Sequence, residues 1–197
     1  NDYELPQPKN IINKFFKTSY NSADDLKNII AEIDTFLDKQ QNIDLENIKI
    51  ICTALISLNQ NKDILQARSY VEPIWIKLSK VDQWYLTDIR IIHSILYFFP
   101  NDIAIEMANT LLSRIYNYKD FQDSNRLVTT LKLNLSLLLI KEKDFKTALN
   151  VLEDILNKHK VGMTQQSLSV LFIRIAICRK MLQLGKEDEY LEQAAQL

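Results

Sequence analysis

Glycine, proline and cysteine are scarce in this chain of 197 residues, which contains two glycines, four prolines and two cysteines. Tight turns and phosphate-binding loops need glycine, so β-hairpins and glycine-rich nucleotide sites are nearly excluded. Cys52 and Cys178 lie in apolar helical patterns, where a small buried thiol is the expected state, and they indicate neither a disulfide framework nor a zinc site. Unpaired thiols fit a reducing, cytoplasmic location.

An excess of one charge is also absent, because 24 basic and 25 acidic residues leave a formal net charge of −1. Direct binding to nucleic acid normally requires a basic face or stripe, so the chain alone is not expected to bind DNA. Apolar runs stay short of the ~18 residues of a membrane span, and residues 1–20 lack the apolar centre of a signal peptide. We expect a cytoplasmic protein that does not contact a membrane.

Motifs of catalysis and metal binding are missing as well. The sequence has no HExxH pair, GxSxG elbow, CxxC or Walker loop, so nothing in it favours an enzyme. His159 stands at a predicted helix end, where we expect a solvated cap or a contact with the helix dipole. Acidic residues at 24–25 and 187–189 fall in predicted first turns, where the dipole favours negative charge. We predict no catalytic residue, no metal ligand and no cofactor.

What the sequence does contain is a series of helix-start signals. Ser22, Asp44, Asn101 and Thr164 each resemble an N-cap before a segment with helical apolar periodicity,. This periodicity predicts an all-α protein of about ten helices. The predicted helices cover residues 7–18, 22–40, 44–58, 62–79, 82–99, 102–118, 121–141, 144–159, 164–183 and 187–196.

The second helices of successive predicted pairs share a pattern in which alanine follows three residues after a bulky apolar residue. Ala67, Ala108 and Ala148 are separated by 108 − 67 = 41 and 148 − 108 = 40 residues, and a weaker copy begins at Leu191 and Ala194. Small residues let packed helices approach closely. Generic amphipathic helices are the alternative, but three aligned copies favour a right-handed α-solenoid of tetratricopeptide-like helix pairs, whose first helices line a concave surface.

Polar side chains interrupt apolar stripes on three predicted first-position helices. In WYLTDIRIIHSILYFFP, residues 84–100, helical spacing places Arg90, His93 and Tyr97 on one side, together with Leu86,. The opposite, core-like side is formed by Ile89, Ile92, Leu96 and Phe99. The first of these two sides is either a second packing surface or a ligand surface.

Two further interruptions are Asn134 and Arg174. Asn134 shares a helical side with Leu127, Leu131 and Leu138, and Arg174 shares one with Val170, Leu171, Ile177 and Cys178. A buried unpaired amide costs ~1–3 kcal/mol and a buried guanidinium costs more. Such groups therefore pair internally or face a groove. Both roles stay open for Asn134, and an ion pair with a neighbouring helix is slightly preferred to a ligand role for Arg90 and Arg174.

Together these interruptions predict a peptide-binding groove. The candidate site residues are Arg90, His93, Tyr97, Asn134 and Arg174. An amide offers a donor and an acceptor to an extended peptide backbone, and a guanidinium offers a fork to a carboxylate. We expect Asn134 to hold the peptide backbone, one arginine to hold its carboxylate, and Tyr97 to cover its apolar side chains.

The sequence resembles the C-terminal helical domain of the Rgg/GadR/MutR transcriptional regulators, within the wider group of peptide-sensing regulators with tetratricopeptide-like domains. The resemblance rests on WYLTDIRIIHSILYFFPNDIAIEMANTLL and LKLNLSLLLIKEKDFKTALNVLEDIL and covers residues 63–197. Its motifs are Trp84, Asp88-Ile89, Asn134, and Lys143-Asp144-Phe145 with Ala148. The family more often has Glu where Asp88 stands, and an amide near His93-Ser94.

The resemblance implies a cytoplasmic homodimeric regulator in which an N-terminal helix-turn-helix domain binds DNA and this domain receives a short signalling peptide. The chain opens with Asn and shows no DNA-binding segment. We therefore expect residues 1–20 to be the linker and first helix after such a domain, and residues 21–197 to be the helical-repeat regulatory domain. The C-terminal helices, with Tyr190 and Leu191, are the expected dimer contact. The alternative function is a helical-repeat scaffold that binds a protein partner without a role in transcription.

Overall fold

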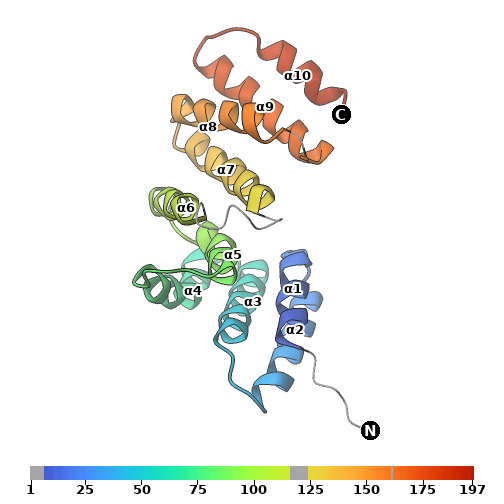
Figure 1. The fold of residues 1–197 in the computed structure, drawn as a ribbon, viewed down its shortest axis with the longest axis vertical. Helices are drawn as coiled ribbons and strands as arrows, with labels where there is room; N and C mark the ends of the chain where they lie inside the picture. The colour runs from blue at the N-terminus through green and yellow to red at the C-terminus, as the bar shows by residue number, and fades with distance from the viewer. Residues whose placement is uncertain (1–6, 116–123, 161) are drawn as a thin grey trace. The chain divides into compact units, whose positions relative to one another are not determined.

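A computed structural model of the chain describes residues 7–115, 124–160 and 162–197. These residues form ten α-helices and one short 3-10 helix, with no strand among them (Figure 1). The predicted all-α helical-repeat fold is confirmed. Residues 1–6 of the predicted linker and first helix (1–20), and the ends of two predicted helices within 116–123, lie outside the described residues.

The chain divides into two compact units, Asn1–Phe99 and Pro100–Leu197. In the first unit, consecutive helices pack on one another, and α3 also contacts α1 and α5. Its elements are α1 (Pro8–Lys17), α2 (Ala23–Leu37), α3 (Ile43–Asn61), α4 (Ile64–Ser79), α5 (Leu86–Ile95) and the 3-10 helix η1 (Leu96–Phe98). Its core is built from aliphatic and aromatic side chains that recur three or four residues apart, as an amphipathic helix requires,.

In the second unit each helix packs against the next one in the sequence, and α7 also contacts α9. Its helices are α6 (Asn101–Ile115), α7 (Ser124–Lys141), α8 (Phe145–Lys158), α9 (Gln165–Met181) and α10 (Glu187–Ala195). Nearest-neighbour stacking of this kind is how helical repeats bury a continuous core. No helix in the described ranges combines the length and the apolar character that crossing a bilayer requires.

The aligned alanines are buried in the cores of the two units, Ala67 in the first and Ala108 and Ala148 in the second. Their helices are α4, α6 and α8. The positions seven residues further on are buried as well; they are Ile74, Ile115 and Ile155. The repeated positions therefore form packing faces, as expected from their spacing. In the weaker fourth copy, Ala194 is half-buried.

Two of the four predicted N-caps are confirmed and two are wrong. The side-chain oxygens of Ser22 and Thr164 accept hydrogen bonds from main-chain N–H groups three residues on. Helix α3 is capped by Asn42 instead of Asp44, because the Asn42 amide oxygen accepts from the first helical turn at 3.0 Å. Asn101 is the first residue of α6 itself, since the helical hydrogen bonds begin at the carbonyl of Pro100.

The helix predicted over 82–99 is shorter than expected. It begins at Leu86 and tightens into η1 after Ile95. Its start is set by Asp88, whose carboxylate accepts from the Tyr85 N–H at 2.7 Å. Trp84 just before it is buried, and its indole N–H donates to a main-chain carbonyl at the end of α4 at 2.8 Å. Arg90 and His93 therefore stand on a regular helix, while Tyr97 stands on the 3-10 turn.

Candidate functional site

Three of the five predicted site residues lie in the first unit, on α5 and η1. The guanidinium of Arg90 lies over the ring of Phe16 on α1, 5.6 Å from its centroid, which is the geometry of a cation–π contact,. Tyr97 is 42% exposed, so its ring reaches solvent. The opposite side of this segment is buried, as its apolar periodicity predicted; it comprises Ile89, Ile92, Leu96 and Phe99.

His93 is half-buried, and burial lowers the pKa of its imidazole to about 4. The ring is therefore neutral near pH 7 and offers one donor and one acceptor instead of a charge. Its neighbour Ser94 is buried, with its hydroxyl 3.0 Å from the Tyr20 hydroxyl and donating to the Arg90 carbonyl at 2.9 Å. This part of α5 is tied to the segment that joins α1 and α2.

The other two predicted residues lie in the second unit, on α7 and α9. Asn134 is half-buried beside the buried Leu131 and Leu138. The guanidinium of Arg174 donates to the Leu133 main-chain carbonyl and lies 3.4 Å from the Ser136 hydroxyl, both on α7. Arg174 therefore donates to neutral oxygen acceptors on α7. The sequence pattern alone did not specify these partners.

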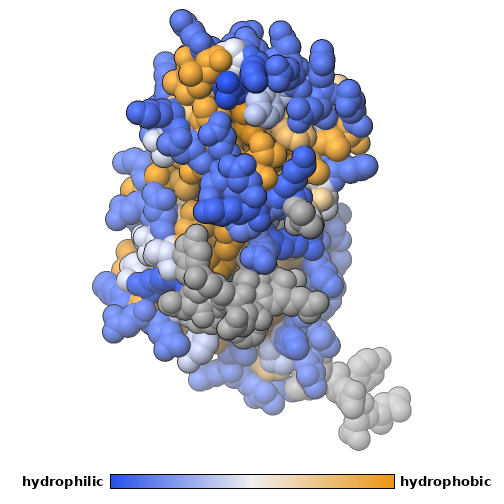
Figure 2. All heavy atoms as spheres, turned by 45° about the horizontal axis from the view of Figure 1, so that its top comes forward, coloured by the Kyte–Doolittle hydropathy of each residue, from blue (hydrophilic) through white to orange (hydrophobic). Residues whose placement is uncertain are grey.

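The exposed face of α9 differs from the sequence-based expectation. Ile177 was grouped with a buried side, yet it is 40% exposed, and Ile173 and Met181 are 42% and 56% exposed. Residues four apart drift by only roughly 40° around a helix, so the three side chains form one aliphatic stripe. Arg174 stands at the border between this stripe and the buried side. Figure 2 shows apolar side chains, in orange, reaching the surface between polar ones.

The predicted site residues thus fall into two groups, one in each unit. In the second unit, α7 and α9 are in contact, so Asn134 and Arg174 belong to packed neighbours. In the first unit, Arg90 and His93 lie within one turn of each other on α5, and Tyr97 follows one turn later.

A cavity that sequence reasoning did not foresee lies within the second unit. Its volume is about 480 Å³, and it is bordered by the first half of α7, the end of α8, residues 162–164 and the first turn of α9. Its lining residues are Asn125, Arg126, Thr129, Thr130, Leu133, Lys158, His159, Gly162, Met163, Thr164, Gln166 and Ser167. Most of them are polar, and none of these described lining residues is acidic.

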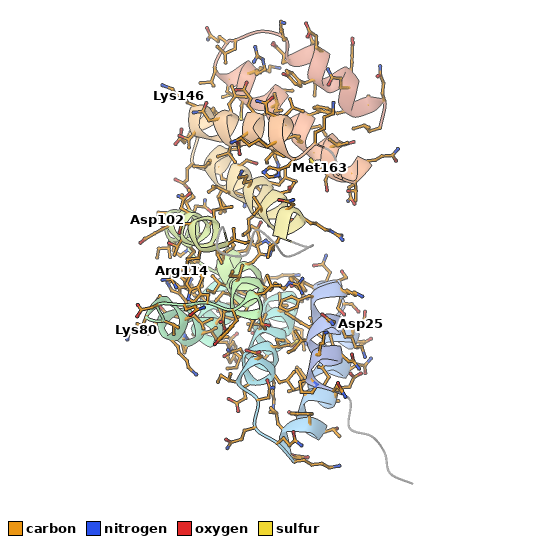
Figure 3. The ribbon with its side chains drawn as sticks, viewed as in Figure 1. Asp25, Lys80, Asp102, Arg114, Lys146 and Met163 are labelled. Carbon is orange, nitrogen blue, oxygen red and sulfur yellow. The ribbon has the colours of Figure 1, made fainter. Side chains whose placement is uncertain are left out.

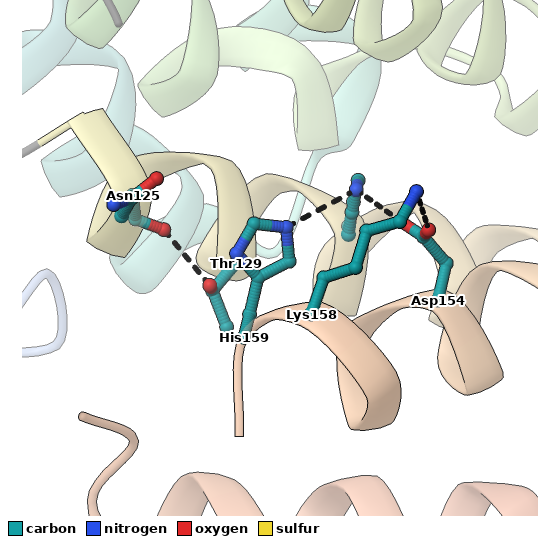
Figure 4. A network of polar contacts seen from close by, with 6 residues as sticks. Asn125, Thr129, Asp154, Lys158 and His159 are labelled. Atoms are coloured by element: carbon teal, nitrogen blue, oxygen red, sulfur yellow. Dashed lines mark hydrogen bonds and ion pairs between the residues drawn. The ribbon is translucent and has the colours of Figure 1, made fainter. Parts of the chain in front are cut away.

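A network of charged side chains adjoins this cavity. Lys132 on α7 is only 8% exposed, and its ammonium group donates to the Asp154 carboxylate on α8. The same ammonium group lies 3.5 Å from Nε2 of His159. Lys158 joins the network through Asp154, at 2.6 Å (Figure 4). One carboxylate is therefore shared by two lysines, next to a histidine.

Two groups of the network, Asp154 and His159, have shifted pKa values. Hydrogen bonds from Lys132 and then Lys158 hold the pKa of Asp154 below its usual value. Burial, followed by the positive charge of Lys132, lowers the pKa of His159. His159 does end α8, as predicted, but it is half-buried and its charged form is disfavoured. His159 is thus the cap of α8, and the contact with Lys132 is what the sequence did not predict.

One signal in the sequence could have found this site. Lys132 interrupts the run LKLNLSLLLI in the same way as Asn134, and a lysine is almost never buried unless it is paired,. Its partners, however, are 22 and 27 residues away on another helix. In the described part of the chain, no three His, Cys, Asp or Glu side chains gather where a metal ion could be held.

Comparison with known proteins gives a family match and a structural likeness. Residues 30–188 match the family described as HTH-type transcriptional regulator Rgg, C-terminal domain. No curated protein matches the chain. Among solved structures, the crystal structure of the apo form of RapI is similar, with a TM-score of 0.63 and 16% sequence identity over 98% of this chain. The chain spans 55% of the length of that structure's chain, and at this identity the likeness shows a shared fold alone.

Proposed function

The chain belongs to the Rgg family of HTH-type transcriptional regulators as a C-terminal domain, and on this premise we propose that it receives a short signalling peptide and forms a homodimer. The family match begins at residue 30, upstream of the segment on which the sequence resemblance rested. In this proposal, contact with DNA is made by a separate N-terminal helix-turn-helix domain, and the protein acts in the cytoplasm.

The observation that carries the peptide proposal is the aliphatic stripe of Ile173, Ile177 and Met181 on α9. Contiguous exposed aliphatic side chains mark interaction surfaces in soluble proteins. Burying them is favourable by roughly 25 cal/mol per Å² of apolar area. A peptide with apolar side chains would supply that cover, and Arg174 stands beside the stripe to meet its polar groups.

Polar contacts complete the proposed site. Asn134 on the adjacent α7 would hold the backbone of an extended peptide through its amide. A guanidinium has five N–H donors, so Arg174 can donate hydrogen bonds to α7 and to a peptide carboxylate at the same time. In the first unit, the exposed Tyr97, with Arg90 and His93 on the preceding turns of α5, is a separate candidate ligand contact.

The test uses short, fluorescently labelled synthetic peptides rich in Leu, Ile and Phe, with binding followed by fluorescence anisotropy. Ile177→Glu should abolish binding, because it places a charge in the apolar contact. Ile76→Glu is the matched control, since Ile76 is a similarly exposed isoleucine on α4, a second-position helix. Asn134→Ala should weaken binding by roughly one hydrogen bond, ~0.5–1.5 kcal/mol.

The scaffold function remains the second candidate, because an exposed apolar stripe also suits a protein partner. The two proposals differ in whether the wild-type chain binds short apolar peptides through the stripe on α9. Failure of all such peptides to bind the wild-type chain, or equal effects of Ile177→Glu and Ile76→Glu, would contradict peptide recognition. A parent reading frame that begins with a helix-turn-helix segment would favour the transcription regulator over the scaffold.

A further inference from the structure

The sulfur-containing residues of this chain differ in their access to solvent. The sequence has three methionines and two cysteines, and all of them lie in the described ranges. Met107 is fully buried, and Met163, which lies between α8 and α9 (Figure 3), is partly buried against the core of the second unit. Met181, by contrast, is 56% exposed. An oxidant dissolved in water therefore reaches Met181 more easily than the other two methionines.

The two cysteines are shielded from oxidants both by burial and by their protonation state. Cys52 and Cys178 are buried, and burial raises the pKa of their thiols to about 12 and about 11. Both thiols are therefore protonated near pH 7, and it is the thiolate that reacts with oxidants. A methionine thioether carries no proton, so its reactivity is controlled by access and not by a pKa.

Met181 also occupies one end of the aliphatic stripe on α9. It is the last residue of this helix and follows Ile177 by one turn, as Ile177 follows Ile173. The two isoleucines are hydrocarbon side chains, which a peroxide does not attack. Met181 is thus the one member of the stripe whose polarity can be changed by oxidation, and this change leaves the buried core in place.

We propose that Met181 is a site of reversible oxidation by hydroperoxides, and that its sulfoxide weakens the binding of apolar ligands to the stripe. The sulfur lone pair attacks one oxygen of the hydroperoxide, so that an S–O bond forms and the O–O bond breaks. Sulfur is oxidised by two electrons, and the peroxide is reduced by the same two. With hydrogen peroxide, the released hydroxide takes the proton of the transferred OH group and leaves as water.

The sulfoxide changes the stripe because its oxygen is a polar acceptor where the thioether was apolar. An apolar ligand that covers this oxygen supplies no donor, and burying an unsatisfied acceptor corresponds to a loss of affinity of roughly tenfold. A thiol-dependent methionine sulfoxide reductase reverses the step, since two thiols become a disulfide and the oxygen leaves as water. The effect on peptide recognition rests on the function proposed above, whereas the oxidation site itself does not.

The first test treats the full chain with dilute hydrogen peroxide and follows the sulfoxides by peptide mapping with mass spectrometry. We expect Met181 to be oxidised first, Met163 more slowly, and Met107 last, in the order of their exposure. Oxidation of Met163 or Met107 as fast as Met181 overturns the proposal, because exposure would then not select the site.

The second test measures binding before and after peroxide treatment. Its probes are the labelled apolar peptides described above and anilinonaphthalene sulfonate, a dye that fluoresces on exposed apolar surface. Each variant is compared with itself, so that any effect of a substitution on its own affinity cancels. The wild type and the matched control Met163→Leu should lose affinity by roughly tenfold after oxidation, and Met181→Leu should keep the affinity that it had before. Treatment with the reductase should restore binding to the wild type.

The outcomes separate this proposal from the peptide function. An equal loss in Met181→Leu and Met163→Leu overturns it, because another residue would then cause the change. Unchanged binding of the dye and the peptides by the oxidised wild-type chain overturns it as well. If no peptide binds the untreated chain, the peptide function is contradicted, and the dye measurement decides the oxidation proposal by itself.

Discussion

The guanidinium of Arg174 on α9 donates a hydrogen bond to the main-chain carbonyl of Leu133 on α7, so one side chain links two helices that are separated in sequence by α8. The same guanidinium lies 3.4 Å from the hydroxyl of Ser136, which is fully buried. Arg174 therefore contributes to the packing of the second unit as well as standing beside the aliphatic stripe.

Replacing Arg174 with methionine should lower the stability of the fold. Methionine keeps the apolar stem but removes the charged donor, and a hydrogen bond from a charged group contributes ~1.5–3 kcal/mol; the Leu133 carbonyl keeps the Ser136 hydroxyl as a donor. The measurement is chemical denaturation followed by circular dichroism. Arg126→Met is the control, because Arg126 is an exposed arginine on α7. Equal stability of the wild type and Arg174→Met would show that the link between α7 and α9 is energetically neutral.

His93 should titrate well below an ordinary histidine. Burial lowers the pKa of its imidazole from 6.5 to about 4, so between these pH values the unfolded chain binds more protons than the folded one. The stability contributed by His93 is therefore complete above pH 6.5 and is lost as the pH falls toward 4, by at most about 1.4 kcal/mol per pH unit.

The sequence has only two histidines, so NMR can follow both imidazoles without ambiguity. We expect a midpoint near 4 for His93, and a smaller loss of stability on acidification in His93→Gln. A His93 midpoint near that of a free imidazole would mean that water reaches the ring, which would contradict the packing of α5 described above.

Enlarging a repeat alanine should overpack the contact between helices. Ala148 on α8 is fully buried, and adding methylenes to a well-packed site typically costs ~1–3 kcal/mol. Ala148→Leu should therefore lower the melting temperature, while Ala195→Leu, at an exposed alanine on α10, should not. Unchanged melting of both variants would remove the structural meaning of the alanine alignment.

The proposed dimer contact can be tested at Leu191 on α10. Its neighbour Tyr190 is engaged within the unit, with its ring 6.1 Å from that of Phe172 and the guanidinium of Arg179 at 5.9 Å. Leu191 is exposed and is left to meet a partner subunit. Sedimentation should show a concentration-dependent dimer that Leu191→Glu weakens and Leu65→Glu, at an exposed leucine on α4, does not. A monomer at all concentrations would contradict this contact.

The sequence by itself determined the helical elements, the caps at Ser22 and Thr164, and the packing faces around Ala67, Ala108 and Ala148. These features depend on hydrogen bonds and side-chain spacing within a few residues, which the chain specifies locally. The cap at Asn42 and the start of α6 at Asn101 were missed because several neighbouring residues could have occupied each position. The core side of the 84–100 segment was also predictable, since its apolar residues recur at helical spacing.

The tertiary structure alone decided which polar groups meet and which apolar groups stay exposed. Lys132 is joined to Asp154 and His159 only because α7 and α8 pack side by side. Ile177 belongs to an apolar stripe in the sequence, but no local rule states whether a neighbouring helix covers it. Burial depends on the faces that other helices occupy, and these contacts join residues tens of positions apart, beyond the range of any helical period.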